Sequence, residues 1–179
     1  MAIFSERIPS KRELFLVFGA CVVPIHIWAI VNALRATSSW ILSMNLWDVL
    51  GTFAYTQAMA FVESLLYLLG LVVLSIVLPL SWMRRRFVVQ GAVLAFVVSI
   101  SSMITVYYSD TLPIWTRNGL LQWLMVIIFI SIVISFLLSR IPKAEKMISQ
   151  IVEKMTILAA LYILIDMLSI VVIFFRNIG

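Results

Sequence analysis

The chain has 179 residues, of which 64% are apolar and only 12% are charged. This charged share is about half that of an ordinary soluble domain, so the chain has too little polar surface to cover a globule in water. Lysine and arginine together number 13, against 8 acidic residues, and they stand in short clusters between apolar runs. Such clusters suit anionic lipid headgroups and give no indication of nucleic-acid binding.

Five apolar stretches are each long enough to cross a bilayer as a helix. A hydrocarbon core of ~30 Å requires about 20 apolar residues, and an irregular crossing would leave backbone groups without hydrogen bonds. We therefore expect an all-α integral membrane bundle of five transmembrane helices that forms a single domain over residues 1–179. The predicted spans are residues 14–34, 58–80, 87–107, 119–138 and 155–175.

The first span, residues 14–34, contains Cys21, the only cysteine of the chain. One cysteine can form neither an intrachain disulfide nor a thiolate metal site. Pro24 lies inside this span and frees the carbonyl of Ala20, so we expect a kink near His26.

The apolar stretch from Val49 to Trp82, which contains the second span, is longer than one crossing requires. We place the crossing at residues 58–80 and predict a short interfacial or partly re-entrant helix over Trp40–Tyr55. Asn45 is its candidate N-cap and Gly51 a candidate break. One long tilted helix that projects from the bilayer is the alternative.

The basic residues of the connections predict the orientation of the chain, because cytoplasmic loops carry an excess of lysine and arginine. The segment before the first span and the connections between the second and third and between the fourth and fifth spans together hold ten such residues. The segments on the other side hold three. The N-terminus is therefore expected in the cytoplasm and the C-terminus outside. The ten are Arg7, Lys11, Arg12, Arg84, Arg85, Arg86, Arg140, Lys143, Lys146 and Lys154, and the three are Arg35, Arg117 and Arg176. Arg84, Arg85 and Arg86 are interpreted as a topology determinant that contacts lipid headgroups; a specific anionic-lipid or partner site is the alternative.

Two spans carry stripes of small residues, which let membrane helices approach closely. The stripes are Gly91, Ala95, Ser99 and Ser102 in span 87–107, and Ser131, Ser135 and Ser139 in and after span 119–138. We expect both to face other helices, of this chain or of a partner. The alternative is that small residues are simply common in membrane spans.

The segment from Pro142 to Met155 is amphipathic, with Pro142 well placed as a first helical residue. It predicts a cytoplasmic surface helix that leads into the last span. Its apolar face either anchors it in the interface or docks a cytoplasmic partner.

Three ionisable side chains lie inside apolar spans: His26, Glu63 and Asp166. Such groups are expected to face the bundle interior and to find partners there. Small or hydroxyl-bearing residues share their helix faces, which indicates an inward orientation. The candidate polar residues are His26, Glu63, Tyr67, Tyr162, Asp166 and Ser169.

Two interpretations of these residues compete. Glu63 and Asp166 could exchange protons or ions with His26 as relay, in a shared pocket in the outer half of the membrane. Alternatively, the three groups hydrogen-bond between helices or to a partner subunit and transport nothing.

No catalytic, nucleotide-binding or metal-binding motif occurs in the sequence, and no cofactor is expected. The favoured function is therefore a non-catalytic accessory, assembly or scaffold subunit that associates with another membrane protein or with itself. A small oligomeric proton- or ion-coupled transporter or channel is the second hypothesis, and a lipid-modifying membrane enzyme the third. The absence of an Asn-x-Ser/Thr acceptor favours a prokaryotic plasma membrane.

Overall fold

The computed structural model describes residues 9–78, 83, 86–108, 117–139 and 141–178. Within these residues the chain forms five helices and no strand. They are α2 (Lys11–Ser43), α3 (Leu46–Val77), α4 (Phe87–Tyr107), α5 (Arg117–Ser139) and α6 (Pro142–Ile178). Four of them, α2, α3, α4 and α6, are long and apolar enough to cross a membrane; in α5 the apolar stretch is the shorter Leu121–Ile134.

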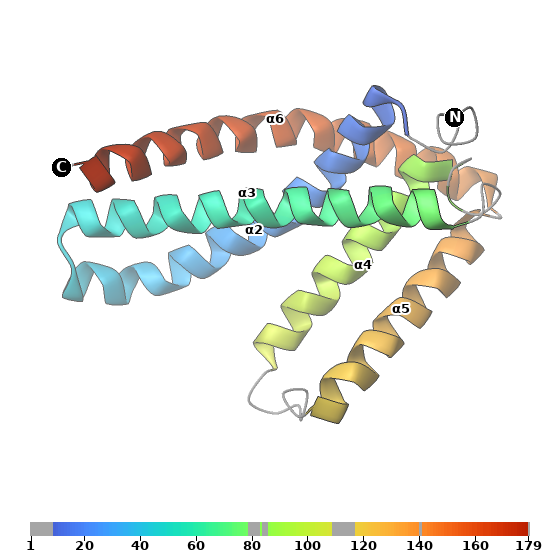
Figure 1. Cartoon of the computed structure of the whole chain (residues 1–179), viewed down its shortest axis with the longest axis horizontal. Coiled ribbons are helices and arrows are strands. Elements are labelled where there is room, and N and C mark those ends of the chain that lie inside the picture. The colour runs from blue at the N-terminus through green and yellow to red at the C-terminus, as the bar shows by residue number, and fades with distance from the viewer. Residues whose placement is uncertain (1–8, 79–82, 84–85, 109–116, 140, 179) are drawn as a thin grey trace.

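The helices are arranged around α2, which packs against α3, α4 and α6. Figure 1 shows α3 and α6 running in opposite directions along the length of the molecule, with α2 crossing beside them. The α4–α5 pair leans away from this group, and α5 lies at the edge, mainly against α4. Every residue from Val17 to His26 is buried. A helix that is apolar on all sides over such a stretch belongs at the centre of a bundle.

Capping side chains fix where α2 and α3 begin. The Ser10 hydroxyl accepts a hydrogen bond from the Glu13 backbone N–H, and the Glu13 carboxylate accepts one from the Ser10 N–H. Asn45 Oδ1 accepts a hydrogen bond from the Asp48 N–H at 2.9 Å. The predicted N-cap at Asn45 is confirmed, as is Pro142 as the first residue of a helix.

The region before the second predicted span differs from the prediction. Trp40–Ser43 belong to α2, and α3 runs without interruption from Leu46 through Gly51 to Val77, so no separate interfacial helix over Trp40–Tyr55 exists. One long helix, as in the alternative, is what the structure has; its tilt and its projection from a bilayer stay predictions. Likewise the amphipathic segment from Pro142 is continuous with the last span, as one helix, α6. Pro24 lies inside α2, which continues past it.

Two glycines lie where helices of this core approach one another closely. A Cβ atom on Gly19 of α2 would lie 3.1 Å from Thr156 Cα of α6, and one on Gly91 of α4 would lie 3.1 Å from Val17 Cγ1 of α2. Because lipid supplies little hydrophobic drive between helices, such close contacts hold the bundle together.

Candidate functional site

A buried histidine and a buried aspartate meet between α2 and α6. His26 Nε2 lies 3.0 Å from Asp166 Oδ1 and 3.1 Å from Oδ2, and both side chains are almost fully enclosed. The second imidazole nitrogen, Nδ1, donates to the carbonyl oxygen of Val22 at 2.9 Å. The sequence predicted inward-facing partners for these residues, and the structure brings these two together.

The hydrogen bonds restrict where the protons of this pair can be. A carbonyl oxygen only accepts, so Nδ1 carries a hydrogen. Between Nε2 and the carboxylate there is then one shared proton, which gives either imidazolium with carboxylate or neutral imidazole with carboxylic acid. Both arrangements have zero net charge, which is the arrangement least penalised in a low-dielectric interior.

Further polar side chains are buried on the inner faces of α2, α3 and α6. The Tyr162 ring lies 5.0 Å from the His26 ring, centroid to centroid, at an interplanar angle of 31°. We give the name polar core to six of these residues: His26, Gln57, Ser64, Tyr162, Asp166 and Ser169.

Two members of the polar core, Gln57 and Ser64, were not predicted. Both are fully buried on α3. The Ser64 hydroxyl donates to the Ala60 carbonyl oxygen at 2.7 Å, whereas neither amide atom of Gln57 has a hydrogen-bond partner in the described part of the chain. A stripe of small residues on α3, with Gly51, Ala54 and Ala60 around Gln57, was the available signal.

Glu63 does not reach the polar core. It lies on the exposed side of α3, together with Met59, Leu66 and Gly70. Glu63 and Gly70 therefore lack the inward orientation expected of them, whereas Ala60 of the same predicted face is buried. The described residues provide Glu63 with no hydrogen bond and no ion pair. The described residues therefore form no pocket that joins Glu63 to His26 and Asp166, which the transport hypothesis requires.

Tyr67 links α3 to α4 instead of joining the polar core. Its hydroxyl lies 3.4 Å from the hydroxyl of Ser102, which is itself an exposed residue. The other small residues of the α4 stripe, Gly91, Ala95 and Ser99, are buried. On α5, Ser131 is buried and donates to the Ile127 carbonyl oxygen; the side chains of Ser135 and Ser139 lie outside the described part.

A groove opens at the end of the molecule where α4 and α6 begin. Its volume is about 460 Å³, and Glu13, Arg86, Glu145 and Lys146 contribute its charged lining. Arg86 Nε lies 3.7 Å from Glu145 Oε2, so the one described member of the predicted headgroup cluster is engaged in an ion pair. Arg84 and Arg85 lie outside the described residues.

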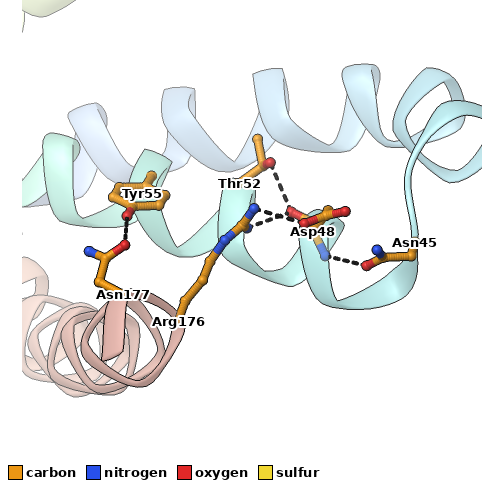
Figure 2. A network of polar contacts seen from close by, with 6 residues as sticks. All are labelled: Asn45, Asp48, Thr52, Tyr55, Arg176 and Asn177. Carbon is orange, nitrogen blue, oxygen red and sulfur yellow. Dashed lines mark hydrogen bonds and ion pairs between the residues drawn. The ribbon is translucent and has the colours of Figure 1, made fainter. Parts of the chain in front are cut away.

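At the opposite end, polar contacts join the start of α3 to the end of α6 (Figure 2). Arg176 Nη2 donates to Asp48 Oδ1 at 2.8 Å, and Nη1 donates to the Asp48 carbonyl oxygen at 3.2 Å. The Tyr55 hydroxyl donates to Asn177 Oδ1 at 3.1 Å. The Arg176 side chain lies where a Cβ atom on Gly51 would be, so any larger residue there would displace it.

The chain matches no protein-family model, and neither a curated protein nor a solved structure is significantly similar to it. The functional argument therefore depends on the geometry described above.

Proposed function

We propose that the chain is a non-catalytic subunit of a membrane protein assembly, and that it binds its partner through the exposed face of α3 around Glu63. The observation that carries this proposal is an exposed carboxyl group near the middle of a long apolar helix. Charged residues at the centre of a membrane helix cost about 2.5–3.5 kcal/mol on insertion scales. A partner that pairs with Glu63 removes this cost.

Gly70 gives independent support, because it is the residue two turns further along the same face. A Cβ atom on Gly70 would meet no other atom within 4 Å, so nothing in the described part of this chain requires a glycine there. On a membrane helix, an exposed glycine allows the backbone of another helix to approach closely.

The chemistry of Glu63 selects the kind of partner. A second copy of this chain offers no complementary cation at that depth, because the apolar stretch of each helix lacks lysine and arginine. Its one histidine, His26, is buried and bonded on both nitrogens. The proposed partner is therefore a transmembrane helix of a different protein that carries a lysine or arginine facing Glu63.

The setting of the assembly is part of the proposal. The clusters of basic residues support five spans in a plasma membrane, with a cytoplasmic N-terminus and an extracytoplasmic C-terminus. The absence of an Asn-x-Ser/Thr acceptor from the sequence supports a prokaryotic membrane.

Photo-crosslinking in the native membrane tests the partner face. A benzophenone side chain placed at Leu66, which is 60% exposed on the Glu63 face, is expected to crosslink to a transmembrane peptide containing lysine or arginine. Interhelical hydrogen bonds in membranes contribute about 0.6–1.7 kcal/mol. Glu63→Gln should therefore lower the crosslink yield roughly three- to eighteenfold. Gly70→Leu should lower the yield as well, because its side chain blocks the close approach of the partner helix.

Two controls accompany this test. Glu153→Gln makes the same chemical change at an exposed position near the start of α6 and should leave the yield unchanged. A benzophenone at Phe129, 68% exposed on α5, should capture lipid alone. Capture of only lipid at Leu66, or equal yields in all variants, would show that the Glu63 face has no protein partner.

A further inference from the structure

The helices α4 and α6 begin at the same end of the molecule (Figure 1), and their first residues line the groove described above. Among the described residues, Arg86 and Lys146 contribute positive groups to this lining, and Glu13 and Glu145 contribute negative ones. The volume of about 460 Å³ falls in the range of about 300–1,000 Å³ that is usual for small-molecule sites. A lining of both signs favours a ligand that carries both charges and no net charge.

Three of the four charged groups are available to a ligand. The exception is Glu13, whose carboxylate accepts a hydrogen bond from the Ser10 N–H at 2.7 Å. Among the described residues, no carboxylate lies within ion-pairing distance of Lys146, which is exposed. Glu145 Oε2 and Arg86 Nε are 3.7 Å apart, and both side chains are more than a third exposed. Charge-assisted hydrogen bonds between such groups are about 2.7–2.9 Å long, so this ion pair leaves hydrogen-bonding capacity on both partners.

The position of the groove along the bundle indicates that the ligand is a lipid headgroup. The helix α4 has 21 residues and measures about 32 Å at ~1.5 Å per residue, which matches a hydrocarbon core of ~30 Å. Where α4 crosses the bilayer, its first residue, Phe87, lies at the level of the headgroups. Phe87, Val88 and Val89 contribute apolar surface to the lining, beside the charged residues of α6. Apolar surface next to charged groups fits a molecule that is polar at one end and hydrocarbon at the other.

We propose that the groove binds the headgroup of phosphatidylethanolamine, a phospholipid with a phosphate and a primary ammonium group. Arg86 and Lys146 donate hydrogen bonds to the phosphate oxygens, and Glu145 accepts one from the ammonium group. A trimethylammonium headgroup has no N–H to donate to Glu145, and phosphatidylglycerol has no cation to offer it. The proposal uses the membrane setting but does not depend on the partner proposed for Glu63.

Lipid binding to the purified full chain tests this proposal. Native mass spectrometry in a mild detergent compares phosphatidylethanolamine, phosphatidylcholine and phosphatidylglycerol with identical acyl chains, each added to delipidated protein. Phosphatidylethanolamine should bind severalfold more tightly than either of the others. Lys146→Gln should lower its affinity roughly two- to fivefold, the range for partly exposed ion pairs. Glu145→Gln should abolish the preference over phosphatidylcholine.

Two controls lie on the same helix outside the groove. Lys143→Gln and Glu153→Gln make the same chemical changes at exposed positions of α6, and both should leave the affinity and the preference unchanged. A Tm within a degree or two of that of the unmodified chain shows that each variant is folded.

Equal affinities of the unmodified chain for the three lipids, or equal effects of Lys143→Gln and Lys146→Gln, would overturn the proposal. Tightest binding of phosphatidylglycerol would overturn it as well, because the basic residues at this end would then attract anionic lipid without a defined site. Displacement of the lipid by an equal concentration of free phosphoethanolamine would show that the groove is a site for the soluble compound instead.

Discussion

Each nitrogen of the His26 ring has a hydrogen-bond partner inside the bundle, whereas the Asp166 carboxylate depends on His26. Removing one partner from such a pair leaves the other buried without compensation, which costs about 3–5 kcal/mol in soluble proteins. Removing both partners together leaves an apolar contact between α2 and α6. A single substitution in the pair is therefore expected to cost more free energy of unfolding than the intact pair contributes to it.

We predict that His26→Leu lowers the Tm of the full chain by several degrees, because it leaves Asp166 buried and unpaired. The double variant His26→Leu/Asp166→Leu should recover most of this loss. Thermal unfolding in one detergent, followed by circular dichroism, measures both. A double variant as unstable as the single one would show that the pair is not an isolated energetic unit.

The polar residues on α3 show how far the sequence predicts a site at this scale. Ala60 belongs both to the predicted face, with Glu63 and Tyr67, and to the buried face, with Gln57 and Ser64. Adjacent residues are separated by about 100° around a helix, since 3.6 residues make one turn. The faces overlap, and both contain polar and small residues. Only the packing of α2 and α6 against α3 decides which face turns inward.

Asp166 was easier to place. It shares its predicted face with Ala159, Tyr162 and Ser169, and all four are buried in the structure. The opposite side of α6 carries large apolar residues in that region, so the contrast between the two faces was clear. A lone ionisable residue among small neighbours predicts burial well when no second polar face competes with it.

At the scale of helices, glycines of two kinds occur. Gly19 and Gly91 lie at close contacts between helices, whereas Gly70 faces open space. The first kind is required by packing within the chain, and the second kind is free to serve a contact with another protein. Substitution at the two kinds should therefore affect different measurements.

Gly91→Leu is predicted to destabilise the bundle, because its side chain would be forced against Val17 of α2. Overpacking of this kind costs about 1–3 kcal/mol, which lowers the Tm by several degrees. Gly70→Leu should leave the Tm within a degree or two of the unmodified chain, as surface substitutions usually do. Equal losses in both variants, measured by thermal unfolding in detergent, would contradict this distinction.

The boundaries of α3 were predicted only in part. Asn45 was recognised as the N-cap because a short polar side chain before an apolar run satisfies the first free N–H groups locally. The continuation through Gly51 was missed, because a glycine usually weakens a helix by about 1 kcal/mol. The reason for a glycine at position 51 lies in α6, more than a hundred residues away, because the Arg176 side chain occupies the space next to Gly51. Local patterns do not contain such information.

For the whole molecule, the helices fall into two length classes. α2, α3 and α6 have 33, 32 and 37 residues, and α4 and α5 have 21 and 23. At 1.5 Å per residue the long helices measure about 48–55 Å, well beyond a ~30 Å hydrocarbon core. In the proposed membrane setting, tilt or projection from the bilayer accommodates the difference. Apolar length alone predicted five spans; the described residues form five helices, of which four are long and apolar enough to cross a membrane. The extra length of the long helices was not predicted.

The proposed orientation predicts that a reporter fused after Gly179 is extracytoplasmic. A reporter inserted between α2 and α3, next to Asn45, should lie on the same side, and one between α5 and α6 on the cytoplasmic side. Paired fusions to an enzyme active only outside the cytoplasm and to one active only inside it measure this. A cytoplasmic location of the fusion after Gly179 would reverse the proposed threading.

The contact of Arg176 and Asn177 with α3 (Figure 2) also bears on how the protein is handled in the laboratory. Removing the last few residues, or attaching an affinity tag directly after them, would disturb the hydrogen bonds that Arg176 and Asn177 form with Asp48 and Tyr55. An affinity tag on a flexible spacer, or one placed before Ser10, would leave these contacts between α3 and α6 intact.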